Sequence, residues 1–444
     1  MKGPTSKNII PLLIICVVFF VFGFATWINA ILIPYFKIAC QLTNFQSYLV
    51  TFAFYISYLV ISVPSSYLLK KIGFKKGMMV GFWIMAIGAF IFIPAAMVRS
   101  YYLFLTGLFI IGIGLAILQT AANPYVTILG AKDRAAQRIS MMGICNKTAG
   151  IIAPLLLAAV IIKPGDSQLF KDIQLMDDSH KKLALDMLIK RVIPPYAFVG
   201  SILALLGLLI RYSPLPEIDK VGDNEELPDE FNKTKIYHFP HLVLGVFAIF
   251  FHVGSQVIAI DTIIPYAQSM GMPLAEAKVF PSYTLFATIC GYLMGICLIP
   301  WVISQKNALR ICTVLGCVFS IFVVISWWQV DLLGHHSGMS LWFIVLLGFA
   351  NSMIWAGIWP LALNNLGKHL KIGASLLIMG LCGNAILPLF YGYFADRFNL
   401  QQAYLVLLPC YCYLVFYAFY GHRIMKWTFN INNSKNEFFK FENH

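Results

Sequence analysis

The sequence predicts an all-α membrane protein of about twelve transmembrane helices, arranged as two six-helix bundles. The composition is 59% hydrophobic and only 11% charged, and the mean hydropathy is +0.78, which is too apolar for a soluble protein. Apolar runs of about 20 residues, the length that crosses a bilayer, recur along the whole chain. Runs of this strength indicate helices, because the strands of a membrane barrel show only a weak alternation.

The apolar segments form two groups around a polar stretch. The first group lies near 9–36, 45–69, 77–97, 101–130, 138–162 and 192–211, and the second near 241–266, 277–303, 307–329, 340–366, 372–395 and 401–425. The polar stretch between them is acidic, contains prolines and has few apolar residues, which indicates a flexible linker. The polar segment 164–193 contains LALDMLIKRVI, which predicts a short amphipathic helix. We therefore expect an N-terminal bundle at 1–211, a cytoplasmic linker at 212–240, a C-terminal bundle at 241–427 and a cytoplasmic tail at 428–444.

The two groups also share short sequence features. MGIC at 142–145 returns as MGLC at 379–382, Pro124 has a counterpart in Pro360, and Pro154 has one in Pro388. Each pair is separated by 234 to 237 residues, close to half the chain. A repeat of six helices in one orientation predicts two bundles that rock about a substrate site at the membrane midplane.

The charge distribution predicts the orientation of the chain and its partner. A net charge of +13 would suggest nucleic acid in a soluble protein, but here 21 of the 32 Lys and Arg residues fall on the side of the two termini and 10 on the other. By the positive-inside rule both termini are expected in the cytoplasm, and the partner is the lipid bilayer rather than nucleic acid. The first apolar run is too long for a cleavable signal peptide.

Motifs for other functions are missing from the sequence. The ten cysteines lie almost all in apolar runs without metal-ligand spacing, so we expect buried small hydrophobes and neither a metal nor a cofactor. The chain contains no His-Glu-x-x-His, Gly-x-Ser-x-Gly or Gly-x-x-x-x-Gly-Lys-[Ser/Thr] motif, which argues against a membrane enzyme and a primary pump.

Amide and tryptophan side chains recur inside the apolar runs. Amides offer both donors and acceptors to sugar hydroxyls, and an aromatic face covers the apolar side of a pyranose. Interhelical amides also serve simply to hold helices together, and that alternative stays open. The predicted substrate-binding residues are Trp27, Asn29, Gln119, Asn123, Asn146, Gln256, Asn351, Trp355, Trp359 and Asn384.

Three titratable residues fall in or near the same runs: Lys147, His252 and Asp261. An ammonium group near mid-membrane costs at least roughly 2.5–3.5 kcal/mol, so Lys147 is expected to face the bundle interior. It could form an ion pair with an acid of the other half, or belong to a structural polar cluster. His252 could be a core histidine, and Asp261 could be interfacial.

The loop 65–77, SSYLLKKIGFKKG, resembles the loop between the second and third helices of the major facilitator superfamily. It keeps Gly73 and the basic residues at 70, 71, 75 and 76, but has Ser66 for the first Gly and no Asp. Other segments resemble the fucose/glucose/galactose permease branch of that superfamily, over nearly all of the chain. They are NAILIPYFKIACQLTNFQS (29–47), LQTAANPYVTILG (118–130), RISMMGICNKTAG (138–150), IWPLALNNLG (358–367) and IMGLCGNAILPLFYG (378–392).

This resemblance implies the major facilitator fold and a secondary transporter, acting as a monomer in a bacterial inner membrane, that imports a hexose with a proton. The chain departs from the branch at three positions, because Ala30, Gln119 and Gln256 stand where members carry acids. The branch asparagine of the fifth helix is kept as Asn146. The coupling candidates are therefore Lys147, His252 and Asp261. Sodium coupling, an uncoupled uniporter, a drug exporter of the same fold and a non-transporting sugar sensor are the alternatives.

Overall fold

The computed structural model of the chain describes residues 9–128, 135–163, 165–173, 176–215, 236–299, 302–364, 366, 370–425 and 427. Before the 216–235 gap, the elements are α1 (Ile9–Trp27), α2 (Asn29–Ala39), α3 (Asn44–Ile72), α4 (Phe74–Met97), α5 (Tyr101–Ile128), α6 (Ala135–Ile161), α7 (Asp166–Asp172), α8 (Asp178–Lys190) and α9 (Ile193–Tyr212). After it come η4 (Ile236–His238), α10 (Pro240–Asp261), α11 (Ile263–Ser269), α12 (Leu274–Ala277), α13 (Phe280–Leu298), α14 (Gln305–Ile325), β1 (Gln329–Leu332) and β2 (His335–Gly338). The chain continues with α15 (Met339–Asn351), α16 (Ile354–Ala362), α17 (Leu370–Met379), η6 (Gly380–Cys382), α18 (Gly383–Arg397), η7 (Gln402–Val406), α19 (Leu407–Phe419) and η8 (Gly421–Arg423).

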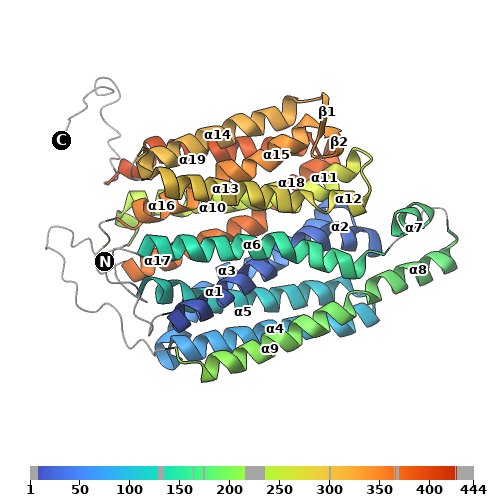
Figure 1. Ribbon diagram of the computed structural model, residues 1–444, viewed down its shortest axis with the longest axis horizontal. Helices are drawn as coiled ribbons and strands as arrows, with labels where there is room; N and C mark the ends of the chain where they lie inside the picture. The colour runs from blue at the N-terminus through green and yellow to red at the C-terminus, as the bar shows by residue number, and fades with distance from the viewer. Residues whose placement is uncertain are drawn as a thin grey trace.

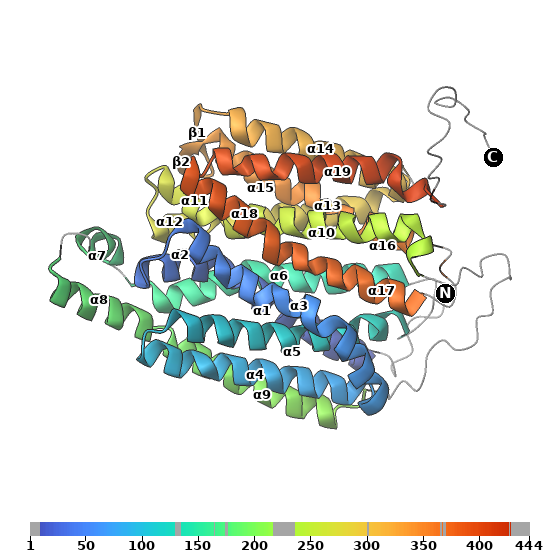
Figure 2. The same ribbon diagram turned by 180° about the vertical axis from the view of Figure 1, so that it is seen from behind.

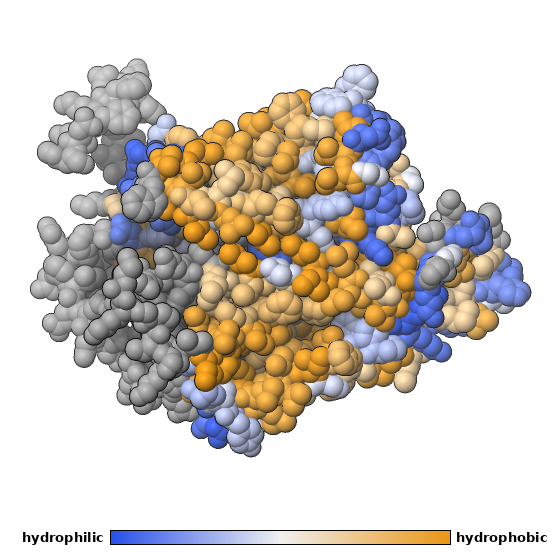
Figure 3. Space-filling view, in the orientation of Figure 1, coloured by the Kyte–Doolittle hydropathy of each residue, from blue (hydrophilic) through white to orange (hydrophobic). Residues whose placement is uncertain are grey.

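Twelve helical segments in the described residues are long and apolar enough to cross a membrane, six on either side of the gap. This confirms the predicted number of spans. Figure 3 shows the same pattern on the surface, where apolar residues cover the long side of the molecule and hydrophilic residues gather toward its two ends. The side chains on this long side face lipid, which explains why many large hydrophobic residues are exposed there.

The helices before and after the gap lie side by side as two groups (Figures 1 and 2). In the first group α4 packs on α5 and α9, and α1 packs on α6; in the second, α14 packs on α15 and α19, and α10 packs on α18. The seam between the groups is formed mainly by α3 against α18 and α6 against α13.

Most of the predicted linker and the whole predicted tail fall outside the described residues, so those boundaries stay predictions.

Glycines allow several pairs of helices to touch through their backbones, and Gly23 and Gly383 are two examples. A Cβ on Gly23 of α1 would lie 1.8 Å from the carbonyl oxygen of Asn146 in α6, and one on Gly383 of α18 would lie 2.0 Å from that of Phe250 in α10. Small residues permit this close approach, which is a common device where lipid provides no hydrophobic driving force between helices. The α1–α6 contact places Trp27 beside Asn146.

Four of the predicted spans are interrupted, which the sequence analysis did not anticipate. Breaks fall at Ile28 between α1 and α2, at Thr262 between α10 and α11, at 352–353 between α15 and α16, and at η6 between α17 and α18. The Thr262 hydroxyl donates to the Ile258 carbonyl oxygen at 2.7 Å, and this kind of local bond often bends helices. The repeat is also imperfect, because MGIC lies within the unbroken α6 whereas MGLC forms the break at η6.

A β-hairpin replaces the end of the predicted segment 307–329. Helix α14 ends at Ile325, and β1 pairs antiparallel with β2. The two turn residues, Leu333 and Gly334, have positive φ angles of 51° and 81°, as a tight hairpin turn requires. We call this end of the molecule the hairpin end; it also carries α7, α8 and α12 (Figure 1).

Two smaller expectations have different outcomes. The predicted amphipathic helix is present as α8, which buries Ala184, Leu185, Leu188 and Ile189. The expectation that the cysteines are buried is wrong for several: Cys312 and Cys410 are buried, but Cys297 and Cys412 are exposed. Both exposed thiols lie on spanning segments, where the surrounding lipid removes the need for burial within the protein.

A polar contact joins the two groups of helices at the hairpin end. Both carboxylate oxygens of Asp396 in α18 accept hydrogen bonds from the first turn of α3: the Asn44 amide nitrogens donate at 3.0 and 2.6 Å, and the Phe45 backbone N–H at 2.8 Å. Lys37 Nζ donates to Asn44 Oδ1 at 2.5 Å. A carboxylate at a helix N-terminus is also favoured by the helix dipole. We call these three bonds to Asp396 the latch, since they close the seam at this end.

We expect Asp396→Ala to open the seam at the hairpin end, because the first-turn amides of α3 lose their acceptor. The measurement is the rate at which a membrane-impermeant thiol reagent modifies a cysteine placed at Ala395 of α18, which is only 7% exposed, in a background without the native cysteines. The rate should rise about fivefold to tenfold, which corresponds to about 1–1.4 kcal/mol. Asp331→Asn is the matched control, because Asp331 is exposed and bonds only within the hairpin, to His336. Equal rates in both variants would show that the latch contributes nothing to closure.

Candidate functional site

Four predicted residues meet near the middle of the spans, and we call them the central cluster: Trp27, Asn146, Lys147 and Gln256. Lys147 Nζ lies 4.2 Å from the centroid of the Trp27 ring and 3.4 Å from Gln256 Oε1. Trp27 Nε1 donates to Asn146 Oδ1 at 3.4 Å. Gln256 lies in α10 and the other three lie in α1 and α6, so the cluster bridges the two groups of helices.

Lys147 is buried without an acidic partner. Lys147 is only 7% exposed, and Trp27 is 3% exposed. None of the ion pairs among the described residues includes Lys147, so the hypothesised pair with an acid of the other half is not formed. Two contacts stabilise the ammonium: the face of the Trp27 indole and the Gln256 side-chain oxygen. A desolvated cation–π contact of this kind contributes about 2 kcal/mol.

The sequence of α6 explains how the cluster is held. Successive helical residues point about 100° apart, so Asn146 bonds to α1 while Lys147 reaches across toward α10. Asn146 Nδ2 also donates to the Phe19 carbonyl oxygen at 3.5 Å. Gly150, one turn later, makes room for the indole: a Cβ there would lie 2.3 Å from Trp27 Cδ1. Gly150 is not among the predicted site residues, because a single glycine in an apolar run does not by itself indicate a binding site.

His252 and Asn351 lie beside the central cluster. His252 is one turn before Gln256 on α10, is 1% exposed, and lies next to Asn351 and within electrostatic reach of Lys147. Asn351 Oδ1 accepts from the Tyr411 hydroxyl at 3.0 Å. His252 Nδ1 and Asn351 Nδ2 have no hydrogen-bond partner in the part of the chain that the structure describes. Two neighbouring buried side chains therefore keep unused hydrogen-bonding capacity beside the cluster.

Asp261 lies apart from the cluster, at the end of α10 toward the hairpin end. It is 1% exposed, so its carboxyl is buried within the protein. Its depth in the membrane, and with it the interfacial alternative, stays a prediction. Its Oδ2 accepts from Thr51 Oγ1 in α3 at 3.2 Å, while Oδ1 has no partner among the described residues. The hydroxyls of Tyr48 and Tyr55, also unpartnered there, are its electrostatic neighbours. Tyr48, Thr51 and Tyr55 share one face of α3, so a carboxyl from one group of helices faces hydroxyls from the other.

The remaining predicted residues are not joined to the cluster by any contact within the described part of the chain. Gln119 donates to the Tyr58 hydroxyl at 2.9 Å. Trp355 and Trp359 stack on each other, with centroids 5.3 Å apart. Asn29 and Asn384 are buried, with unpartnered side-chain atoms. Asn123 lies in α5, but its side chain is outside the described residues.

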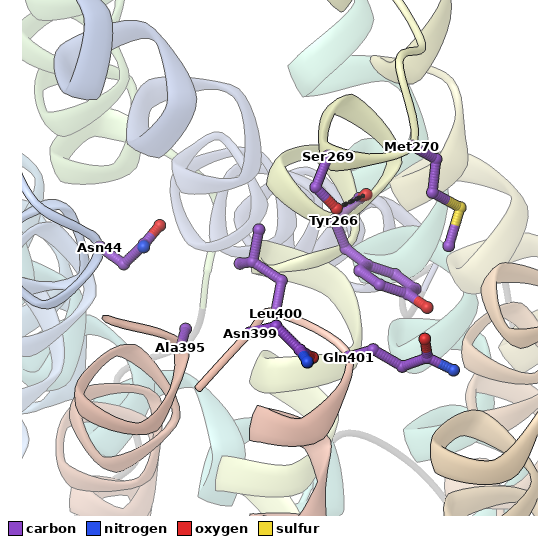
Figure 4. A pocket seen from close by; sticks show the side chains of 8 residues that line it. All are labelled: Asn44, Tyr266, Ser269, Met270, Ala395, Asn399, Leu400 and Gln401. Carbon is purple, nitrogen blue, oxygen red and sulfur yellow. Dashed lines mark hydrogen bonds between the residues drawn. The ribbon is translucent and has the colours of Figure 1, made fainter. Parts of the chain in front are cut away.

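A pocket of about 380 Å³ opens at the hairpin end, next to the latch (Figure 4). Its polar groups are largely occupied. Gln401 Nε2 donates to three carbonyl oxygens at 2.8 to 3.3 Å, the Tyr266 hydroxyl pairs with Ser340, and Ser269 Oγ donates to the Tyr266 carbonyl oxygen. We therefore regard it as a vestibule at the seam. It is lined by Asn44, Tyr266, Ser269, Met270, Ala395, Asn399, Leu400 and Gln401.

Comparison with known proteins assigns a family to this arrangement. The family described as Major Facilitator Superfamily matches residues 15–376. A glucose/galactose transporter of Brucella abortus is 31% identical over 410 residues, covering 91% of this chain and 92% of the relative. An L-fucose-proton symporter of Escherichia coli is 30% identical over 422 residues, covering 94% of each. The crystal structure of FucP, a transporter in the outward conformation, matches with a TM-score of 0.69 and 27% identity, over 93% of this chain and 99% of FucP.

The burial of Lys147 allows a test of whether the cluster is structural or functional. We expect Lys147→Met to raise the melting temperature of the purified protein by about 2–5 °C, because an apolar side chain replaces an ammonium that has no counter-ion. The measurement is thermal unfolding in detergent. Lys182→Met, at an exposed position on α8, is the control and should change little. A lower melting temperature for Lys147→Met would support the structural polar cluster instead.

Proposed function

Because the chain belongs to the major facilitator superfamily, we propose that it imports a monosaccharide by alternating access, with a proton as the co-transported ion. Its multi-pass, all-α architecture is that of the family. We place the substrate at the central cluster, between the two groups of helices. There the amides of Asn146 and Gln256 and the ammonium of Lys147 offer the donors and acceptors that sugar hydroxyls need.

The single observation that carries this proposal is the contact from Lys147 to Gln256. It joins α6 to α10 across the seam, with both residues inside spanning segments. A ligand bound between them would contact both groups of helices at once, so its binding energy could favour the state in which they close around it. The relatives named for glucose, galactose and fucose support a hexose as the substrate class.

Among the three coupling candidates, we assign the proton to Asp261. The buried acids in the described residues are Asp166 and Asp261. Arg191 Nη1 donates to Asp166 at 2.5 Å and neutralises it. Asp261 has no ion pair among the described residues, and the polar neighbours recorded for it there are the hydroxyls of Thr51, Tyr48 and Tyr55. An ionised carboxylate inside a membrane costs about 2.5–3.5 kcal/mol or more, and binding a proton removes that cost.

The position of Asp261 also couples its protonation to movement. Its hydrogen-bond donor, Thr51, belongs to the other group of helices, so the two groups cannot separate at the hairpin end without breaking this bond. Separation would expose the carboxyl to water, where the charged form is favoured. Asp261 would therefore exchange its proton with water when the two groups of helices are apart at the hairpin end, and would keep the proton when they are closed there. We further propose that both termini are cytoplasmic and that the protein acts as a monomer in a bacterial inner membrane.

Uptake into proteoliposomes tests the function. A panel of labelled monosaccharides is offered with an imposed pH gradient and then with a sodium gradient. We expect accumulation of at least one sugar under the pH gradient, and loss of most of it in Asn146→Ala, because Asn146 bonds to Trp27 within the cluster. Gln119→Ala is the comparison, since Gln119 bonds to Tyr58 outside the cluster and should retain more activity.

The other outcomes of this assay separate the alternatives. Accumulation under the sodium gradient alone would replace the proton with sodium, and equilibration without accumulation would indicate a uniporter. If no sugar enters under any condition, the proposed function is wrong, and a drug exporter of the same fold becomes the leading hypothesis.

The role of Asp261 predicts a specific defect. Asp261→Asn should abolish accumulation under a pH gradient but keep exchange of labelled for unlabelled sugar across the membrane, because exchange needs no net proton movement. Asp261→Glu, which keeps an acid, should recover part of the accumulation. Unchanged accumulation in Asp261→Asn would remove Asp261 from the coupling mechanism, and Asp331→Asn on the exposed hairpin serves as the control.

A further inference from the structure

The central cluster is rich in hydrogen-bond donors, and its lysine, Lys147, forms no ion pair within the described part of the chain. Lys147 has three N–H donors, and the one hydrogen-bond acceptor that the described residues offer it, Gln256 Oε1, is 3.4 Å away. The unpartnered Asn351 Nδ2 adds donor capacity beside His252. The side chain that contacts the ammonium across the seam, Gln256, is a neutral amide and leaves the charge in place.

A neutral sugar does not complement such a site well. Its hydroxyls can accept hydrogen bonds from Lys147, but they leave the charge in place, and a buried unpaired charge is costly. A carboxylate would neutralise the ammonium and accept charge-assisted hydrogen bonds, which are roughly twice as strong as neutral ones. Its two oxygens together accept up to about four bonds, which suits the donors that the cluster leaves unused.

We propose that the substrate is an anionic monosaccharide, a sugar that carries a carboxylate, and that Lys147 binds this carboxylate. The proposal rests on the proposed function, since it names the substrate class of the same site. The indole of Trp27 seats the ammonium, and Gln256 and Asn146 remain available to sugar hydroxyls. Asn351, from the second group of helices, lies beside His252, one turn from Gln256 on α10, and would contribute its Nδ2 donors when the two groups close around the substrate.

Equilibrium binding to the purified protein tests this directly. The probes are D-galacturonate and D-glucuronate, each compared with the parent hexose, D-galactose or D-glucose, by isothermal titration calorimetry at one pH and ionic strength. We expect at least one uronate to bind about tenfold or more tightly than its parent hexose, as a charge-assisted hydrogen bond predicts. Wild-type protein alone decides this part, so the result does not depend on a variant that fails to fold.

Variants then assign the preference to Lys147. The ratio of uronate to hexose affinity should fall about tenfold or more in Lys147→Gln and persist in Lys147→Arg, which keeps the charge. Lys182→Gln, which removes an exposed charge on α8, should leave the ratio as in the wild type. A preference for uronate that survives in Lys147→Gln would refute the role of Lys147.

The failure of this inference is distinguishable from the failure of the proposed function. If the neutral hexose binds as tightly as the uronate, or more tightly, the anionic substrate class is wrong while sugar transport stands. If neither class binds and neither enters proteoliposomes, both are wrong. A uronate that binds and accumulates supports both.

Discussion

The burial of one ammonium group, that of Lys147, constrains how the centre of this protein is built. A charge in the interior of a membrane must face other protein groups or water, so α6 has to turn Lys147 away from lipid. The structure seats it on the indole of Trp27, which requires α1 and α6 to touch at Gly23 and leaves room only for Gly150 beside the ring. The one amide that reaches it comes from α10. Lys147 therefore takes part both in the packing of α1 on α6 within the first group and in the contact of that group with the second.

Most of the fold could be predicted from the sequence, because hydropathy alone determines which segments leave water. Twelve spans in two groups follow from apolar runs such as 45–69 and 401–425. The breaks within spans could not be predicted, since they depend on local competition for backbone bonds, as at Thr262, and not on hydropathy. The hairpin after α14 could not be predicted from hydropathy either, because Trp327 and Trp328 extend the apolar run although the helix has already ended at Ile325.

The site was predicted in part. Trp27, Asn146, Lys147 and Gln256 stood out because polar groups are costly inside apolar runs, and that cost does bring them together. The same reasoning also selected Gln119, Trp355 and Trp359, which pair with nearer neighbours instead. Thr51, Tyr48 and Tyr55 could not be selected, because hydroxyl side chains are common in membrane helices. They gain meaning only from Asp261, which lies more than 200 residues away in the chain.

Lys147 and Asp261 have opposite charges, and the proposed roles of the two residues support each other. The resemblance to the permease branch implies acids at the positions of Ala30, Gln119 and Gln256, whereas here a base, Lys147, stands at the centre and an acid, Asp261, stands nearer the hairpin end. If Lys147 binds a substrate carboxylate and Asp261 binds one proton, the loaded carrier neutralises both of these buried groups at the same time. The unloaded carrier neutralises neither. Because an uncompensated charge opposes closure of the seam, the fully loaded state would cross the membrane interior most readily, and partial loading would be disfavoured. Coupling would then follow from the cost of burying charge, without a direct contact between the sugar site and Asp261.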